Sequence, residues 1–262
     1  MKTRILTFTD CTDVASNELQ AILNRSIDDL DMDGKIAIEP FVSCQEFSTI
    51  NCAFMIRLLA ESYNPLNTVF LIVANSLPTA RANRARLVGR TKNGFRFVAE
   101  NTGALSWLLD DFGLAEVYEY SSHGLDGRAF VSFGGKYFHA PEAVKVASLT
   151  KLDGYENKFD PSRMTRLEIV NGTIVHVDNF GVAKVKMILP TDLAEGDKLQ
   201  LAVNGQDWNT VVFSHAMKNL PDNTWAIYKG SSMGLTEVGC VRKIVRDSAD
   251  LSIGNIISIR RS

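Results

Sequence analysis

The feature that most constrains the fold is a regular alternation of apolar strands and amphipathic helices over residues 5–74. Its clearest strand is Thr68-Val-Phe-Leu-Ile-Val-Ala74, whose unbroken β-branched and aromatic residues are typical of a strand buried on both faces. Earlier strands are predicted at 5–10 and 36–42, and helices at 15–27 and 50–63. This order predicts an α/β domain with a mostly parallel sheet.

Polar residues follow two of these strands. Asp10 comes at the end of the first strand, and Asn75-Ser-Leu-Pro78 follows the third. In parallel sheets ligands bind beyond the carboxyl ends of the strands, so these positions are where we expect function.

The pattern changes near residue 153. Residues 155–163 are polar and contain Pro161, which indicates a linker. From residue 165 onward, short strands alternate with turn signals such as Asn171-Gly172 and Asn204-Gly205. The sequence therefore predicts an α/β domain at 1–158 and a small all-β domain, a barrel or a sandwich, at 165–262.

Charge and composition weigh against several classes of function. The chain has 28 basic and 30 acidic residues and a net charge of −2, so it exerts no general attraction on nucleic acid or anionic membranes. A local group of basic residues is expected to form a solvated face or a subunit contact rather than a nucleic-acid site: Arg81, Arg84, Arg86, Arg90 and Lys92.

The N-terminal segment and the cysteines indicate a cytoplasmic protein. Asp10 interrupts the first apolar run before a signal-peptide core could form, and no window approaches the roughly 20 apolar residues of a membrane span. The 4 cysteines lack the close spacing that metal sites use, so we expect reduced thiols and no metal.

The segment Asp178-Asn179-Phe180-Gly181 ends an alternating strand and combines an acid, an aromatic ring and a glycine. A carboxylate can accept hydrogen bonds from an amino group or from sugar hydroxyls, and a ring can stack on a ligand. The same residues are also typical of an ordinary strand-ending turn, so both interpretations stay open at this point.

Short motifs along nearly the whole chain carry a resemblance to a known family. Phe8-Thr-Asp-Cys-Thr12 is similar to that family's Thr-Thr-Asp-Phe-Gly, and Asp178-Asn-Phe-Gly-Val182 is similar to its Asp-x-Phe-Gly-Asn. Glu100-Asn-Thr-Gly-Ala-Leu-Ser106 is similar to Pro-Asp-Asn-Gly-Leu-Leu-Ser, and residues 230–238 are similar to Asn-Ser-x-Gly-Leu-x-Glu-Ile. The chain thus resembles the S-adenosylmethionine hydroxide adenosyltransferase family, which is related to the chlorinase and fluorinase that use S-adenosylmethionine.

The resemblance implies S-adenosylmethionine as the substrate or ligand, with no other cofactor and no metal. In this family a nucleophile displaces methionine at the ribose C5′ carbon, and water as the nucleophile gives adenosine. Family members are usually homotrimers, whose sites lie between the N-terminal domain of one subunit and the β domain of its neighbour. The sulfonium is a good leaving group, so the protein mainly has to position and desolvate the nucleophile.

Matched one by one, several residues are expected to bind the ligand. Asp10 corresponds to the carboxylate that accepts hydrogen bonds from the ribose hydroxyls. Asp178, with Phe180 beside it, corresponds to the contact with the amino-acid part of the ligand. The other expected ligand contacts, of which the last three are expected near adenine, are Asn75, Asn101, Ser231, Ser232 and Glu237.

Most of the family's catalytic groups are absent. Its Asp-Pro-Gly-Val-Gly-Thr-x-Arg is here Ala74-Asn-Ser-Leu-Pro-Thr-Ala-Arg81, which keeps Arg81 but has Ala74 at the Asp position. The family's His falls at Gly134, and Val182 replaces the Asn of the later motif. Arg81 alone stays protonated and cannot act as a general base.

Neighbouring residues could substitute for the missing groups. Glu100 is a candidate acid, and Asn75 could hold a water without acting as a base. His139 comes five positions after Gly134, and on a strand this odd offset turns it to the opposite face. Three functions stay open: hydrolysis of S-adenosylmethionine, non-catalytic binding of an adenosine-containing ligand, and adenosyl transfer to a different small nucleophile.

Overall fold

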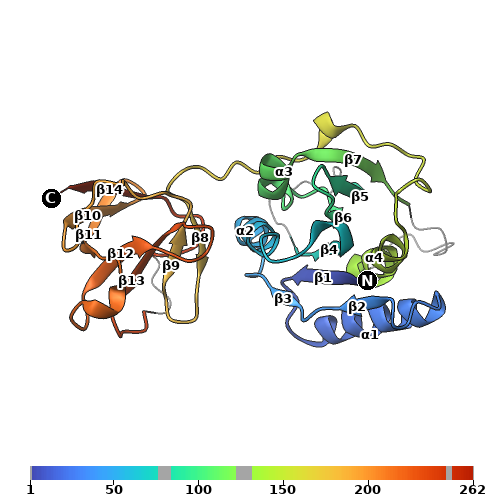
Figure 1. Cartoon of the computed structure of the whole chain (residues 1–262), viewed down its shortest axis with the longest axis horizontal. Coiled ribbons are helices and arrows are strands. Elements are labelled where there is room, and N and C mark those ends of the chain that lie inside the picture. The colour runs from blue at the N-terminus through green and yellow to red at the C-terminus, as the bar shows by residue number, and fades with distance from the viewer. Residues whose placement is uncertain (1, 76–83, 122–131, 246–249, 262) are drawn as a thin grey trace. The chain divides into compact units, whose positions relative to one another are not determined.

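The computed structural model describes residues 2–75, 84–121, 132–245 and 250–261 (Figure 1). The chain divides into two compact units, Met1–Leu167 and Glu168–Ser262. Residues 155–163, which the sequence predicts to be a linker, lie against the first unit. Phe159 is buried there, and its N–H donates to the Val117 carbonyl oxygen at 3.0 Å. The division between the units therefore falls after the predicted linker.

The first unit is built on a mixed sheet with the strand order β2-β1-β4-β6-β5-β7, and β3 also pairs with β1. β1 runs parallel to β2, β3 and β4, and β4 runs parallel to β6. β5 is antiparallel to both β6 and β7. The strands are β1 (Thr3–Thr9), β2 (Ile36–Ile38), β3 (Val42–Ser43), β4 (Thr68–Val73), β5 (Arg86–Thr91), β6 (Arg96–Glu100) and β7 (Leu114–Glu119).

Helices cover both faces of this sheet (Figure 1). On β4, Val69, Leu71 and Val73 pack with α1 and α4, whereas Phe70 and Ile72 pack with α2 and α3. Burial on both faces accounts for the unbroken apolar run at 68–74. The helices are α1 (Val14–Asp29), α2 (Thr49–Leu59), α3 (Ser106–Phe112), the π-helix η3 (Gly135–His139), α4 (Ala140–Ser148), and the 3-10 helices η1 (Pro65–Asn67) and η4 (Pro161–Arg163).

The first strands and helices lie close to where the sequence predicts them, except that α2 ends at Leu59 and not at residue 63, and capping side chains set where the helices begin. Asp13 caps α1 by accepting a hydrogen bond from the Ala15 N–H at 3.0 Å, and Ser48 caps α2 in the same way. The strand predicted at 36–42 is divided into β2 and β3 around Pro40, which has no N–H to donate to a neighbouring strand.

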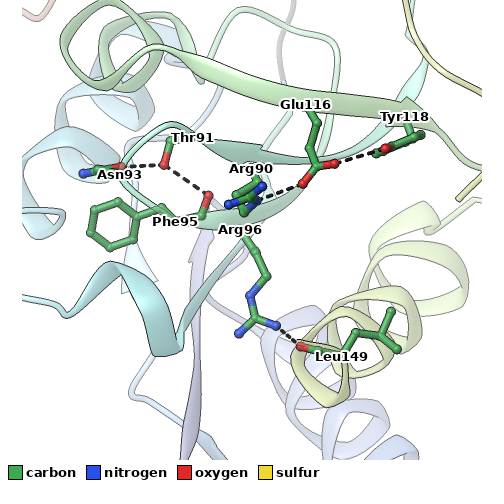
Figure 2. Close-up of polar contacts among 8 residues, drawn as sticks. All are labelled: Arg90, Thr91, Asn93, Phe95, Arg96, Glu116, Tyr118 and Leu149. Carbon is green, nitrogen blue, oxygen red and sulfur yellow. Dashed lines mark hydrogen bonds and ion pairs between the residues drawn. The ribbon is translucent and has the colours of Figure 1, made fainter. Parts of the chain in front are cut away.

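Arg96, at the start of β6, ties the sheet to the C-terminal end of α4 (Figure 2). Its side chain is buried, and its Nη1 donates to the carbonyl oxygen of Val146 at 2.7 Å and to that of Leu149. Burial, followed by the nearby charge of Arg90, lowers the pKa of Arg96 from its ordinary value. Figure 2 also shows Arg90 of β5 paired with Glu116 of β7. Arg90 Nε donates to Glu116 Oε1 at 2.8 Å, so this pair links the two strands.

The second unit is a curled sheet with the order β14-β10-β11-β12-β13-β9-β8. Its strands pair antiparallel except for β11 with β12. Thr173 and Ile256 form an isolated bridge next to β8 and β14, the two ends of this order, so the sheet curls around an aliphatic core. The elements are β8 (Ile174–Val177), β9 (Ala183–Val185), β10 (Lys198–Val203), β11 (Gln206–Phe213), η5 (Met217–Asn219), β12 (Trp225–Lys229), β13 (Thr236–Cys240) and β14 (Ile257–Arg261).

The predicted fold class is confirmed at the level of an α/β part and a β-rich part. Both sheets are mixed, because antiparallel strands extend the first sheet and one parallel pair interrupts the second. Of the helices in the described ranges, none has the length and apolar character needed to cross a membrane.

Candidate functional site

The first unit contains a cavity of about 690 Å³ at one edge of its sheet. Cys11, just beyond the end of β1, lines this cavity, as do Ala74 and Asn75 after β4 and Glu100 at the end of β6. The volume falls within the range of about 300–1,000 Å³ that is usual for small-molecule sites. The strand ends at which the sequence leads us to expect function thus border a cavity of suitable size.

Asp10 adjoins this cavity through Cys11 and Asn75, and the protein holds its buried carboxylate in place. Its Oδ2 accepts hydrogen bonds from the backbone N–H of Asn75 at 3.0 Å and of Phe47 at 3.3 Å, and its Oδ1 accepts one from Asn75 Nδ2 at 3.2 Å. Asp10 therefore connects the end of β1 to the end of β4 and orients the Asn75 amide at the cavity wall. Its contact with ribose hydroxyls stays a prediction.

Residues 134–141 form the beginning of a helix, not the strand-like run expected from the sequence. The π-helix η3 leads directly into α4, and the Ala140 N–H donates to the Gly135 carbonyl oxygen five residues earlier. Residues five apart in such a turn lie on nearly the same side, and both Gly134 and His139 line the cavity. The prediction that His139 faces away from Gly134 is therefore wrong, because it assumed the two-residue period of a strand.

The sheet register gathers polar groups from three strands at this edge. Glu100 is paired with Arg86, the first residue of β5. Tyr120 follows β7, and its N–H donates to the Arg86 carbonyl oxygen at 3.0 Å. Because side chains alternate along a strand, Glu100 shares a face with Arg96, and that face packs against α4. Glu100 thereby meets His139 at the beginning of α4.

Glu100 is held as a carboxylate. Its Oε1 lies 3.5 Å from His139 Nε2, and its Oε2 lies 3.8 Å from Arg84 Nη1. The interaction with His139 is the largest influence and, with the charges of Arg84 and Arg86, lowers the pKa of Glu100, although partial burial acts in the opposite direction. Glu100 therefore accepts hydrogen bonds at neutral pH and has no proton to donate.

His139 connects Glu100 to a buried tyrosine. Tyr120 Oη lies 2.5 Å from His139 Nδ1, and both side chains are buried. Burial raises the pKa of Tyr120 well above its ordinary value, so its hydroxyl keeps the proton. The direction of the hydrogen bond depends on the ring tautomer, and we assign Tyr120 as the donor and Nδ1 as the acceptor. In a neutral imidazole the other nitrogen then carries the hydrogen, which places an N–H on Nε2, beside Glu100. The three side chains form a chain of donors that ends at the carboxylate.

Gly134 leaves space in front of the Glu100–His139 pair. A Cβ atom at this position would lie 3.9 Å from Glu100 Oε1, 4.0 Å from His139 Nε2 and 3.5 Å from the ring of Phe138. The guanidinium of Arg86 lies 3.7 Å from the centre of the same ring, which fixes the ring's position. A side chain at position 134 would therefore occupy space that both polar groups border.

Of the other residues predicted in the first unit, one lines the cavity, one has a structural role, and one is not described. Ala74 lines the cavity and has no polar side chain. Asn101 is buried, and its side chain donates to the Arg163 carbonyl oxygen at 3.0 Å and accepts from the Thr165 N–H at 2.7 Å, so it fastens residues 163–165 to the end of β6. Arg81 lies outside the described residues.

In the second unit, the Asp178-Asn179-Phe180-Gly181 motif forms a tight turn. Asp178 Oδ1 accepts hydrogen bonds from the N–H groups of Phe180 at 2.9 Å and Val182 at 3.0 Å. This geometry is that of the ordinary turn. The Phe180 side chain is 59% exposed, which leaves the ring accessible within this unit. The ligand contacts of Asp178 and Phe180 stay predictions.

The remaining predicted residues lie around the connection between β12 and β13. Ser231 and Ser232 are in this connection, and Glu237 is a buried residue of β13 that pairs with Lys184 of β9. Burial, and then the charge of Glu237, raises the pKa of Tyr228 above its ordinary value. Glu237 therefore has partners inside this unit, and the adenine contacts expected of these three residues stay predictions.

Comparison with known proteins places the fold but not the activity. No protein-family model matches the chain, and no curated protein matches it. An uncharacterized conserved protein from Thermotoga maritima has a similar structure, with a TM-score of 0.80, 19% identity, and coverage of 98% of this chain and 100% of that one. A conserved hypothetical protein from Thermus thermophilus has a TM-score of 0.73 and 17% identity, with coverage of 99% and 100%. These likenesses show the fold alone.

Proposed function

We propose that this protein binds S-adenosylmethionine and hydrolyses it to adenosine and methionine, by attack of water at the ribose C5′ carbon. The observation that carries the proposal is the ionised Glu100 beside His139 in the cavity of the first unit. The choice of S-adenosylmethionine as the substrate rests on the order of the motifs from Asp10 to Glu237, which resembles the S-adenosylmethionine hydroxide adenosyltransferase family.

The chemistry asks little of the protein beyond positioning. The sulfonium departs as a neutral thioether, so the barrier falls mainly through alignment and partial desolvation of the water. A carboxylate suits both tasks, because it accepts a hydrogen bond from the water and attracts the positive sulfonium. Glu100 is placed at the cavity for this purpose, and the Asn75 amide, fixed by Asp10, adds a polar contact.

The same proposal extends to the other predicted contacts and to assembly. We assign the amino-acid part of the ligand to Asp178 and Phe180, and the adenine to the Ser231, Ser232 and Glu237 region. These assignments imply a homotrimer, because the resembled family binds its ligand between the N-terminal domain of one subunit and the β domain of its neighbour. Light scattering measures the assembly directly, and it does so independently of turnover.

Two alternatives rest on particular cavity residues. Ala74 lines the cavity without a polar side chain, which favours a protein that binds the nucleoside and does not turn it over. Arg84 and Arg86 line the cavity as well, which favours adenosyl transfer to a small anion in place of water. Both alternatives use the same cavity as hydrolysis and differ from it in the product.

The test combines binding with product analysis. The purified protein is titrated with S-adenosylmethionine by calorimetry and then incubated with it, and adenosine and methionine are measured by chromatography. Asn75→Ala should weaken binding, whereas Asn17→Ala, on the exposed side of α1, should not. Binding without adenosine would favour the non-catalytic alternative, and a 5′-substituted adenosine formed with halide or thiol would favour the other. Absence of binding would overturn all three.

A further inference from the structure

The space in front of Gly134 has polar surroundings that suit a water molecule. Its would-be Cβ position is within 4.0 Å of an ionised carboxylate oxygen and an imidazole nitrogen, and the nearest carbon, in the Phe138 ring, is 3.5 Å away. A buried water needs two or more polar partners to be held. Glu100 Oε1 provides an acceptor for it, with His139 Nε2 beside this oxygen.

The contact between Glu100 and His139 is longer than a strong hydrogen bond. Glu100 Oε1 and His139 Nε2 are 3.5 Å apart, which is longer than the usual 2.7–3.2 Å of an N–H···O hydrogen bond. Hydrogen bonds at active sites are often long without the substrate and become shorter when it binds. Because this contact is long, Glu100 Oε1 can also accept a hydrogen bond from a molecule in the cavity.

We propose that Glu100 holds the attacking water and receives its proton, that His139 and Tyr120 position Glu100, and that the absence of a side chain at Gly134 leaves room for the water. This inference rests on the proposed function. Glu100 is the catalytic residue in this assignment, since it touches the nucleophile. His139 and Tyr120 are positioning residues, because they act through Glu100.

The step balances without any further reactant. The water oxygen forms a bond to C5′ while the C5′–S bond breaks, and the electron pair of that bond goes to sulfur to give methionine. The oxygen bound to C5′ then carries two hydrogens and a positive charge, and it gives one proton to Glu100, leaving adenosine. Glu100 later releases this proton to solvent. An ionised carboxylate of lowered pKa is sufficient here, because the oxygen that gives up the proton is strongly acidic.

Gly134→Ala is the sharpest test, because it adds a single methyl group to the space beside Glu100 and His139. The new Cβ would meet its neighbours at 3.5–4.0 Å, which is ordinary contact, and position 134 already has helical backbone angles of φ −59° and ψ −34°. The variant should therefore fold with an unchanged or higher Tm, since alanine favours helix over glycine. We expect its kcat to fall by about 100-fold or more, with S-adenosylmethionine binding retained.

Two further variants and one control complete the experiment. Glu100→Gln keeps the shape and removes the base, so kcat should fall by a similar factor of about 100. His139→Leu should move the acid limb of the pH profile of kcat to higher pH, and His139→Gln, which keeps an N–H, should restore part of the activity. The control is Gly154→Ala, whose Cβ has no neighbour within 4 Å and whose kcat should stay at the wild-type value.

The outcomes separate the two proposals. If the wild type forms no adenosine, the proposed function fails, and the assignment of Glu100 fails with it. If the wild type forms adenosine and either Gly134→Ala or Glu100→Gln keeps its full kcat, the assignment is overturned while the proposed function stands. Loss of S-adenosylmethionine binding in Gly134→Ala would also overturn it, because the space would then hold the ligand and not the water.

Discussion

Arg96 and Glu100 lie four residues apart on β6 and contact opposite ends of the same helical segment. Arg96 binds the carbonyl groups at the C-terminal end of α4, and Glu100 contacts His139 immediately before its first residue. Each charge has the sign that the helix dipole favours at its end, positive at the C-terminus and negative at the N-terminus. One strand thus fixes both the position of the helix and the placement of the cavity's carboxylate.

Replacing Arg96 should destabilise the first unit. Arg96→Met keeps most of the side-chain volume and leaves the carbonyl groups of Val146 and Leu149 without this buried donor. We expect a loss of about 2–3 kcal/mol in the free energy of unfolding, measured with urea. Arg25→Met, at an exposed ion pair with Asp29 on α1, is the matched control and should change stability by less than about 0.5 kcal/mol. Equal losses in the two variants would contradict the role of Arg96.

The pH dependence of stability should contain a contribution from Glu100. Its pKa in the folded protein is lowered, chiefly by His139. The stabilisation is therefore complete above the unfolded-state pKa of about 4.3 and is lost as the pH falls through the folded-state pKa. The difference in unfolding free energy between wild type and Glu100→Gln should shrink between about pH 6 and about pH 3. A difference that stays constant over this range would contradict the lowered pKa.

Asp10 should matter for stability as well as for ligand binding. Asp10→Ala removes the acceptor of two backbone N–H groups and of the Asn75 amide, so we expect a loss of about 1–3 kcal/mol in the free energy of unfolding. Asp10→Asn keeps one acceptor oxygen and should lose less. The thermal shift produced by adenosine or S-adenosylmethionine should disappear in Asp10→Ala; a full shift would argue against a ligand role for this residue.

The hydrogen on the His139 ring should be found on Nε2. With Tyr120 assigned as the donor to Nδ1, the hydrogen of a neutral ring is left on the nitrogen beside Glu100. Ring ¹⁵N chemical shifts at neutral pH distinguish the two tautomers, with His215, which follows β11 in the second unit, as an internal comparison. Tyr120→Phe removes the donor and should let the other tautomer become populated. A wild-type ring with its hydrogen on Nδ1 would contradict the proposed chain of donors.

Gly181 should tolerate alanine poorly. Its φ is +84°, and an added Cβ would lie 2.0 Å from the Val245 carbonyl oxygen. Gly196 has a similar φ of +90° and nothing within 4 Å of its Cβ, so it separates the two effects. Gly196→Ala should cost about 1–2 kcal/mol through backbone strain, and Gly181→Ala should cost about 1–3 kcal/mol more through the clash. Similar losses in thermal or urea unfolding would mean that the clash is relieved.

Local patterns predicted the fold well where one physical cause dominates. The run at 68–74 is a strand because it is buried on both faces, and the apolar spacing at 15–27 gives the amphipathic helix α1. The antiparallel strands β5 and β7 were not predicted. β5 pairs with β6 through a short turn at Asn93-Gly94, a local signal that was missed, whereas β7 pairs with β5 from more than 20 residues away in the sequence. Likewise, residues 155–163 pack against the first unit because Phe159 is buried. Their mostly polar composition predicts a linker and gives no sign of this packing.

The candidate site was harder to predict, because it depends on one turn of backbone. The strand ends at Asp10 and Asn75 were visible in the sequence, and Glu100 and His139 were already candidates. Their proximity was not visible, since the residues around Gly134 give no sign of a π-turn. Tyr120 was missed entirely; its one signal is that it follows a strand whose register brings its end to Arg86 and Glu100.

The π-turn at Gly135–His139 also makes this site sensitive to chain length. A ring closed over five residues holds one residue more than the α-helical turn it replaces. Removing one residue there would let the segment become an ordinary α-helix, with α4 still anchored by Arg96. Gly134 and the residues just before it would then rotate by about 100° around the helix axis relative to His139. A single inserted or deleted residue is thus enough to bring Gly134 beside the Glu100–His139 pair or to move it away.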